Sequence, residues 1–252
     1  MLSGDMSDKN NASLSINNVS HSYGEVQVLN NLSLQVTAGE IVVIVGPSGC
    51  GKTTLLNVLS GYIKPSSGTV QTTGTIRTVY QQGGLFPWLT VAENIKMGLQ
   101  LIKDTTQKEA ELKALLALIH LEDFRNHYPH ELSGGMRQRV ELARAIAGDS
   151  DILLMDEPFS ALDYQTRLRM RLELLRLLHE RQRTVVFVTH DIEEAVQLAD
   201  RVLVLSGRPA TVKRTLSITE KKPREVSNPV VVNAMEEILG ELDLRIKADA
   251  VL

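Results

Sequence analysis

Two patterns of hydrophobic and polar residues divide the chain. Near the N-terminus, residues 14–19 and 28–36 alternate between apolar and polar side chains, as half-buried β-strands do. Residues 21–24 lie between them and are expected to form a turn. Four later stretches are almost continuously apolar, as parallel strands buried on both faces are: residues 41–45, 152–155, 184–188 and 202–205. The last is expected to be the final strand, so the pattern predicts an α/β fold with a β-rich start.

Helical spacing fills much of the segment between the first and the second of these buried strands. Thr90 and Thr106 each stand three residues before a glutamate, which is the spacing of a capping box at a helix start. Residues 90–128 are expected to be helical throughout and to form a subdomain inserted into the α/β core. Behind the second box, one helical face carries the apolar residues Leu112, Leu115, Leu116 and Ile119.

Two more helices are expected towards the C-terminus. One follows residues 160–163 and has its buried face at Leu168, Leu172 and Leu175. Its arginines alternate with acidic residues, which favours a solvated face over a nucleic-acid surface. The other is amphipathic, spans residues 229–242 and is expected to pack on the body of the chain or on a partner. Its apolar face consists of Val231, Met235, Ile238, Leu239 and Leu242.

Composition narrows the class of protein. The chain has 252 residues, of which 43% are hydrophobic and 23% charged, as in ordinary globular proteins. Its net charge of -3 gives no basic excess for a nucleic-acid partner. The single cysteine, Cys50, excludes a disulfide framework and favours a cytosolic setting. Since no apolar run approaches the ~20 residues that cross a bilayer, any action at a membrane would need a partner protein.

A phosphate-binding loop is the most specific motif. The chain matches G-x-x-x-x-G-K-[ST] directly after an apolar strand and before a helical pattern, which is the context that this motif requires. Glycines let successive N–H groups turn inward, and the helix N-terminus adds positive charge. Lys52 would contact the β- and γ-phosphates, and the Thr53 hydroxyl could bind Mg²⁺. The loop consists of Gly46, Pro47, Ser48, Gly49, Cys50, Gly51, Lys52, Thr53 and Thr54.

Polar residues follow two of the other buried strands. Asp156 and Glu157 come directly after the strand at 152–155, and ligands of open α/β sheets bind at such carboxyl ends. Asp156 could hold Mg²⁺, and Glu157 could orient or deprotonate an attacking water. His190 follows the strand at 184–188 and could reach a γ-phosphate, although a lone histidine is more often structural.

Three further segments are candidates for binding. A serine and two glycines in residues 132–136 precede a helix and could form a second anion site. Tyr23 could stack on an adenine base or simply pack against the protein. After Gln81 comes an apolar loop that either packs on itself or binds a partner, with Leu85, Phe86, Pro87 and Trp88.

Taken together, these motifs resemble those of the ATPase subunits of ABC transporters over nearly the whole chain. They follow the order of that family: phosphate loop 46–54, glutamine loop at Gln81, signature 132–136, Walker B strand 152–157, aspartate loop 160–163 and switch histidine His190. Within the family, residues 85–91 and 129–131 resemble the group that imports nitrate, sulfonates and taurine.

The resemblance implies an α/β fold: a P-loop NTPase core with an N-terminal antiparallel β subdomain and an inserted α-helical subdomain. We expect an ATP-binding RecA-like core with the β subdomain in residues 13–89 and 132–215, and the helical subdomain in residues 90–131. Residues 216–252 would be a C-terminal helical extension, and residues 1–12 a disordered tail. The ABC transporter domain as a whole would cover residues 14–240.

The resemblance also implies a mechanism in which two such domains face each other head to tail with ATP and Mg²⁺. ATP on the phosphate loop of one domain is covered by the signature of the other, at Leu132, Ser133, Gly134 and Gly135. The other implied roles are adenine stacking for Tyr23, ATP contact for Gln81, Mg²⁺ coordination for Thr53, Gln81 and Asp156, general base for Glu157, γ-phosphate contact for His190 and the dimer interface for Asp163.

The implied partners are a second ATP-binding subunit, identical or homologous, two membrane permease subunits and a periplasmic or surface solute-binding protein. The chain would lie peripherally on the cytoplasmic face of the cell membrane, with no nucleic acid. Residues 85–88 would receive a short helix of the permease. The imported solute would be a small anion such as nitrate, a sulfonate or taurine, while bicarbonate and a pyrimidine precursor also fit.

Two other classes are weighed against this interpretation. Soluble ABC ATPases of DNA repair, chromosome structure and translation usually carry paired ATPase domains, coiled coils, zinc sites or basic arms, whereas this chain has one phosphate loop and one cysteine. A regulatory subunit that binds ATP without hydrolysing it is disfavoured because Glu157 and His190 are both present.

Overall fold

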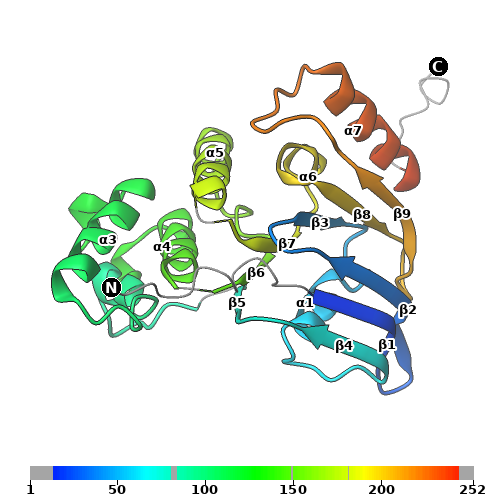
Figure 1. The fold of residues 1–252 in the computed structure, drawn as a ribbon, viewed down its shortest axis with the longest axis horizontal. Coiled ribbons are helices and arrows are strands. Elements are labelled where there is room, and N and C mark those ends of the chain that lie inside the picture. The colour runs from blue at the N-terminus through cyan, green and yellow to red at the C-terminus, as the bar shows by residue number, and fades with distance from the viewer. Residues whose placement is uncertain (1–13, 81–83, 149, 181, 244–252) are drawn as a thin grey trace, which may run out of the picture. The chain divides into compact units, whose positions relative to one another are not determined.

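A computed structural model of the chain describes residues 14–80, 84–148, 150–180 and 182–243 (Figure 1). The chain divides into two compact units. The first consists of Met1–Thr73 and Thr184–Leu252, and the second of Gly74–Arg183. Among the helices of the described residues, none combines the length and the apolar character that a bilayer crossing requires. The predicted tail at residues 1–12 lies outside the described part.

The first unit begins with an antiparallel sheet in the order β2–β1–β4, formed by β1 (Leu14–Tyr23), β2 (Val26–Val36) and β4 (Ser67–Thr72). The alternating apolar side chains of β1 and β2 are buried, as their pattern predicts. The turn predicted at residues 21–24 is wrong in its extent. Tyr23 pairs with Val26, because Gly24 has a φ of 58° and the hairpin needs only two turn residues.

The first unit also contains the strands β7–β3–β8–β9 in that order. β3 (Ile41–Val45), β7 (Thr184–Val188) and β8 (Arg201–Leu205) are parallel, and every residue of β3 and β7 is buried. β9 (Val212–Ser217) pairs with β8 in the antiparallel sense and was not expected from the sequence, which placed the final strand at residues 202–205. Of its described residues only Leu216 is buried, so β9 lacks the apolar signal of the other strands.

Three helices complete the described part of the first unit (Figure 1). α1 (Lys52–Leu59) contacts β2 and β7, and α6 (Ile192–Leu198) packs on β3. α7 (Pro229–Glu241) packs on α6 and β9 and buries Val231 and Ile238. The amphipathic helix predicted at residues 229–242 therefore packs on its own chain.

The second unit joins a parallel strand pair to a group of helices. β5 (Ile76–Val79) pairs with β6 (Ile152–Asp156), whose residues are all buried. α4 (Gly134–Ala147) packs on β5, and α2 (Val91–Lys96) and α3 (Thr105–Leu118) pack on α4. The 3-10 turns Glu122–Phe124 and Pro129–Glu131 and the long helix α5 (Tyr164–Glu180) are the other helical elements in its described residues.

One of the two predicted capping boxes is present. The Thr90 side chain accepts a hydrogen bond from the Glu93 amide, and the Glu93 carboxylate accepts one from the Thr90 amide at 2.8 Å. The box predicted at Thr106 is wrong. α3 begins two residues earlier than that box allows, and its N-cap is Asp104, whose carboxylate accepts a hydrogen bond from the Gln107 amide at 2.9 Å.

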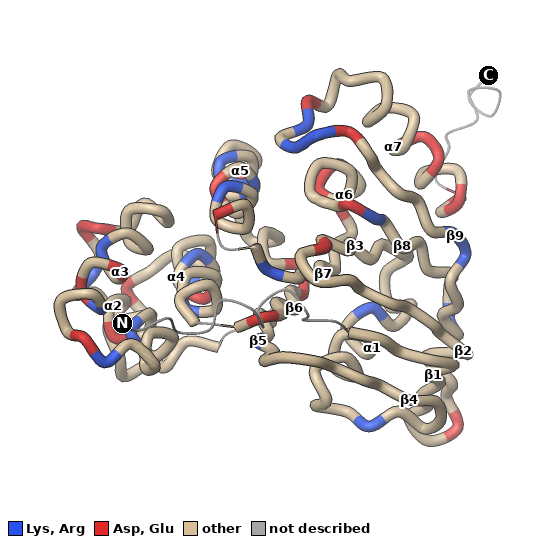
Figure 2. Tube along the Cα trace, viewed as in Figure 1, with Lys and Arg blue, Asp and Glu red and all other residues tan. Residues whose placement is uncertain are grey.

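The predicted buried face of α5 is partly wrong, because Leu168 and Leu175 are half-buried but Leu172 is not. Leu172 is 55% exposed, whereas Arg171 is only 2% exposed. The buried residues of α5 recur at helical spacing on a neighbouring face of the helix. They are Met170, Arg171, Leu174 and Leu178. Figure 2 shows residues of both charges along this helix. Because Arg171 is buried, the arginines of α5 are not all on a solvated face.

Candidate functional site

The phosphate loop lies in the first unit, between β3 and α1. Gly49 has a φ of 71° and Gly51 a φ of 122°, a range that favours glycine. A Cβ atom at Gly51 would also lie 2.7 Å from the Val28 Cγ1 atom. The Cys50 amide donates to the Pro47 carbonyl at 3.2 Å and closes the loop. The backbone thus has the tight, glycine-dependent curl that the motif predicts.

Lys52 is the first residue of α1, and its side chain is buried. Its Nζ atom donates to the Gly46 carbonyl at 2.8 Å and to the Pro47 carbonyl at 3.0 Å. The amides of the first helical turn have no partner within α1, so they and the Lys52 ammonium both present positive charge at the loop. This combination suits a phosphate group.

Cys50 is a packing residue of this loop. Its side chain is buried, and burial raises the pKa of the thiol, although the nearby charges of Lys52 and Arg208 act in the opposite direction. A thiol that stays protonated is a poor nucleophile.

His190 lies at the same sheet edge as the phosphate loop. β3 and β7 run parallel with Ile44 opposite Val188, so Gly46 and His190 both follow the carboxyl ends of adjacent strands. Thr189 fixes the backbone here, because its amide donates to the Ile44 carbonyl and its hydroxyl to a Glu194 carboxylate oxygen at 2.6 Å. The His190 side chain is exposed. The first unit therefore brings together the loop and the predicted γ-phosphate contact.

Tyr23 ends β1 at the hairpin, and its side chain is 52% exposed. The ring makes an edge-on contact with the His21 ring, with 4.8 Å between centroids. One side of the Tyr23 ring is thus held by the protein, and enough of it is exposed for stacking on a flat ligand.

The two predicted carboxylates lie at the end of β6 in the second unit. Asp156 is the last residue of the strand and is buried. Glu157 has a φ of 48°, which is uncommon for a residue with a side chain. Its carbonyl accepts hydrogen bonds from the Ser160 amide at 3.1 Å and hydroxyl at 2.9 Å. The backbone turn directly after the strand is therefore well fixed.

Gln138 of α4 also holds this turn, although no sequence motif predicts a role for it. Its Nε2 atom donates to the Glu157 carbonyl at 3.1 Å, and its Oε1 atom accepts from the Ala161 amide at 3.0 Å. The one sequence signal is that Gln138 is a polar residue on the buried stripe of α4, one turn before Leu142.

The signature segment lies against the same turn. Ser133 caps α4, and its hydroxyl accepts a hydrogen bond from the Met136 amide at 3.2 Å. A Cβ atom at Gly135 would lie 3.3 Å from the Ala161 carbonyl. Leu132 before the cap is buried, and Gly134 begins the helix. The signature, the Glu157 turn and the aspartate loop thus form one cluster.

Asp163 ends this cluster and is exposed. Its carboxylate accepts a hydrogen bond from the Thr166 amide at 3.0 Å. Hydrogen bonds from the Thr166 side chain and amide hold the pKa of Asp163 below its usual value. The carboxylate is therefore ionised near neutral pH and lies on the surface of the second unit.

The backbone of the apolar loop, residues 85–88, is held by hydrogen bonds to the side chain of Asn94, which is fully buried. The Asn94 side chain accepts from the Phe86 amide at 2.8 Å and donates to the carbonyls of Phe86, Leu89 and Thr90. Trp88 lies 5.6 Å from Phe86 between ring centroids, yet its side chain is 70% exposed. The loop backbone is thus packed, as the self-packing alternative expects, while its largest side chain faces outward.

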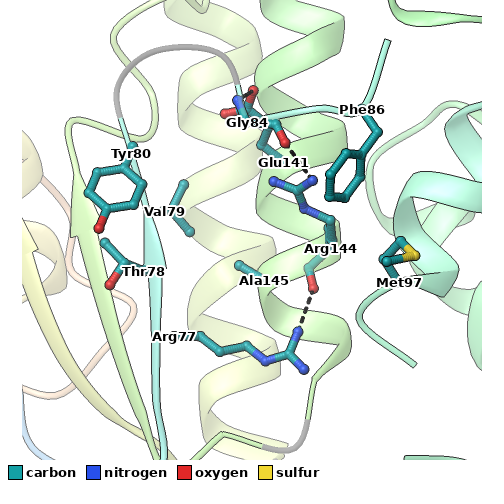
Figure 3. A pocket seen from close by; sticks show the side chains of 10 residues that line it. All are labelled: Arg77, Thr78, Val79, Tyr80, Gly84, Phe86, Met97, Glu141, Arg144 and Ala145. Carbon is teal, nitrogen blue, oxygen red and sulfur yellow. Dashed lines mark hydrogen bonds between the residues drawn. The ribbon is translucent and has the colours of Figure 1, made fainter. Parts of the chain in front are cut away.

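A cavity of about 380 Å³ lies beside this loop (Figure 3). Arg144 crosses it, donating to the Gly84 carbonyl at 2.6 Å with its guanidinium 5.5 Å from the centre of the Phe86 ring. Glu141 accepts from the Gly84 amide at 2.7 Å. The cavity therefore combines an aromatic wall with two arginines, Arg77 and Arg144, and one glutamate, Glu141. Gln81, predicted to contact ATP and Mg²⁺, lies outside the described residues.

Comparison with known proteins shows the family that these features define. The sequence profile of the ABC transporter family matches residues 29–160. The chain is 41% identical to an uncharacterized ABC transporter ATP-binding protein of Methanocaldococcus jannaschii, over 86% of this chain and 85% of that protein. The chain therefore belongs to the ABC transporter family and is an ATPase of that family.

Other relatives have more specific names. A taurine import ATP-binding protein of a Jannaschia species is 38% identical, over 90% of this chain and 92% of that protein. An aliphatic sulfonates import ATP-binding protein of Bacillus cereus is 37% identical, over 91% of this chain and 96% of its own length.

Solved structures confirm the predicted fold class. A dimeric bacterial ABC transporter cassette has a TM-score of 0.75 and 34% identity, covering 82% of this chain and 100% of its own. A dimeric post-hydrolysis state of that cassette with ADP and phosphate has a TM-score of 0.74 and 33% identity over the same shares. The chain is a P-loop NTPase with an antiparallel β-sheet and a helical region.

Proposed function

We propose that the chain is the ATP-hydrolysing subunit of an importer that takes up a small anion, such as taurine, another sulfonate or nitrate, through a separate membrane permease. The observation that carries this proposal is the likeness to proteins named for taurine and sulfonate import, which extends over 90% and 91% of the chain. A periplasmic or surface solute-binding protein would deliver the anion.

The site residues support ATP as the substrate and Mg²⁺ as its cofactor. The glycine curl and Lys52 suit a triphosphate, and Tyr23 is placed to stack on the base. The hydroxyl of Thr53, the carboxylate of Asp156 and the side-chain oxygen of Gln81 are the hard donors that Mg²⁺ prefers. When bound, the ion would neutralise charge on the phosphate oxygens.

Glu157 is the proposed general base, and His190 would hold the γ-phosphate and the attacking water in line. The left-handed backbone at Glu157 supports this role, because such conformations cluster at functional sites. The bonds from Gln138 and Ser160 would keep the carboxylate in one position while a proton is transferred to it. Catalysis would then consist mainly of positioning and charge neutralisation.

A second copy or a homologous subunit would complete the site. The signature segment at the start of α4 would cover ATP held by the opposite phosphate loop, with Ser133 and Gly135 nearest to the phosphates. The similar cassette of known structure is dimeric, which supports this arrangement. Asp163 would lie at the interface, where its exposure leaves it available for contact.

The permease would dock at the loop of Leu85, Phe86, Pro87 and Trp88 and at the adjoining cavity. The support is that Trp88 is 70% exposed on a backbone that Asn94 fixes. Docking there would place the chain on the cytoplasmic face of the membrane as a peripheral subunit, with two permease subunits for two ATPase subunits.

Substituting Glu157→Gln tests this proposal. The variant should bind ATP as the parent does and form an ATP-dependent dimer, because the amide keeps the shape of the side chain. Hydrolysis should fall by about 100-fold or more, since general bases contribute roughly 10²–10⁴. Phosphate release and size-exclusion chromatography with Mg²⁺ and ATP measure both effects.

Glu122→Gln, at an exposed glutamate of the same unit, is the matched control and should behave as the parent. If Glu157→Gln hydrolyses ATP at the parental rate, Glu157 is not the base. If it stays monomeric with Mg²⁺ and ATP, the dimeric mechanism is wrong.

A further inference from the structure

The turn between β8 and β9, residues 206–211, contacts the phosphate loop through Arg208. The Arg208 guanidinium donates to the Gly49 carbonyl from both Nη2, at 2.6 Å, and Nε, at 3.2 Å. Arg208 follows Gly49 by 159 positions in the sequence, and no motif of this chain includes it. Among the described residues of the first unit, Arg208 is the one arginine that is hydrogen-bonded to the phosphate loop.

The turn that carries Arg208 is itself firmly held. The Ala210 amide donates to the Val28 carbonyl at 2.8 Å, and the Asn30 amide donates to the Ala210 carbonyl at 2.9 Å, so the turn pairs with β2. On the other side, the Thr211 amide donates to the Ser206 hydroxyl at 2.8 Å. Arg208 therefore projects from a backbone that is fixed on both sides.

One peptide group of the phosphate loop is held at both ends as a result. Between Gly49 and Cys50, the carbonyl accepts from Arg208 and the amide donates to Pro47 at 3.2 Å. Because a peptide group is planar, fixing both ends fixes the direction of its dipole. β2 also limits the loop at the next residue, where Val28 leaves no space for a side chain at Gly51.

We propose that Arg208 is a positioning residue for the nucleotide, whose guanidinium holds the phosphate loop in the shape that binds the triphosphate. This inference rests on the proposed role of residues 46–54 as the phosphate site. Arginine suits the task because its planar fork offers two donors to one carbonyl, which a lysine ammonium does not match in geometry. A loop held in its binding shape loses less entropy when the ligand arrives.

Binding of inorganic tripolyphosphate and of ATP to the full chain, measured by titration calorimetry with Mg²⁺, tests the inference. Arg208→Ala should weaken both ligands by about 5- to 20-fold, the effect of one lost charge-assisted hydrogen bond. Equal effects on the two ligands would show that the phosphates, and not the base, sense the change. Arg208→Lys should recover part of the loss. The control is Arg214→Ala, which removes an arginine of the same hairpin that pairs with Glu237 instead, and should bind within twofold of the parent.

Cys50 gives a readout that does not depend on ligand. It is the only cysteine of the sequence, and it is buried in this loop. The rate at which a neutral maleimide alkylates the Cys50 thiolate is measured at several pH values. This rate should rise at least fivefold in Arg208→Ala and stay unchanged in Arg214→Ala. Loss of a nearby cation would by itself raise the thiol pKa and slow the reaction, so a faster rate reports an opened loop.

The inference is overturned if Arg208→Ala binds tripolyphosphate within twofold of Arg214→Ala. Weaker binding without faster alkylation also overturns it, because Arg208 would then act through its charge alone. Lys52→Ala separates the two proposals. If this variant binds tripolyphosphate as the parent does, the phosphate site itself has been assigned wrongly; if it loses binding while Arg208→Ala does not, only the role of Arg208 fails.

Discussion

The side chain of Gln138 uses both ends of its amide on the turn after β6. That turn contains a glutamate with a φ of 48°, a conformation that costs of order 1–3 kcal/mol at a residue other than glycine. Two hydrogen bonds from a buried amide can offset such a cost. The position of the proposed base thus depends on a residue that takes no part in the chemistry.

Replacing Gln138 by alanine should therefore affect both stability and turnover. We expect a loss of about 1–3 kcal/mol in the free energy of unfolding, because the turn loses the two partly buried hydrogen bonds of the Gln138 amide. We also expect a lower kcat with little change in the affinity for ATP. Urea denaturation and steady-state hydrolysis measure the two effects. Gln107→Ala, at an exposed glutamine of α3, is the control, and equal results for the two variants would contradict the role given to Gln138.

Sequence reasoning found the residues whose chemistry is local. The phosphate loop was predictable because its glycines, its lysine and its flanking elements lie within a few positions of each other. Gln138 and Arg208 were not, because the groups that they bind are 19 and 159 positions away and only the fold brings them close. The roles of the predicted site residues in binding and catalysis remain predictions.

At the scale of elements, two helix starts show that the spacing of a capping box does not by itself locate the N-cap of a helix. The Thr90 box is present, whereas the same spacing at Thr106 lies inside α3. Asp104 competes successfully for the cap, since an aspartate is at least as good an N-cap as a threonine and it stands two residues earlier.

A pair of alanine substitutions should separate these two positions. Asp104→Ala should lower the free energy of unfolding by about 1 kcal/mol, because the first turn of α3 loses its acceptor. Thr106→Ala should change it by less than about 0.5 kcal/mol, since this side chain is exposed and alanine favours helix. Chemical denaturation of both variants is the measurement. A larger loss for Thr106→Ala would mean that the cap has been assigned to the wrong residue.

The errors in α5 and β9 have a common physical origin. In α5, several stripes contain leucines, so periodicity alone could not choose between them, and the arginine at position 171 is buried where its charge argues for exposure. β9 has mostly polar side chains because it is an edge strand. In both cases tertiary packing decided what the local pattern left open.

At the scale of the whole molecule, the order of motifs along the chain predicted the fold class that the solved structures confirm. The predicted subdomain boundaries are not tested in this way. They are placed at the limits of sequence motifs, whereas the two compact units are defined by contacts in space. The boundaries remain predictions.

The exposed Trp88 gives the whole-molecule proposal a direct test. Trp88→Ala should leave ATP hydrolysis by the isolated chain within about twofold of the parent and change its stability little, because a 70% exposed side chain contributes little to packing. In vesicles reconstituted with the permease and the solute-binding protein, transport should fall by tenfold or more, as expected for loss of an aromatic anchor in an interface.

Tyr62→Ala is the matched control, since Tyr62 is an aromatic residue that is 77% exposed in the first unit. It should leave both activities intact. If Trp88→Ala lost hydrolysis in the isolated chain to the same extent as transport, the loop would belong to the catalytic machinery and not to a coupling surface.

The burial of Cys50 has a practical consequence for following such an assembly at work. Because the sole sulfhydryl of the sequence is shielded, a cysteine introduced at an exposed position would react with a fluorescent dye far faster than the native one. Position 122, exposed and assigned to no interface, would then report on the approach of a donor-labelled and an acceptor-labelled copy by energy transfer.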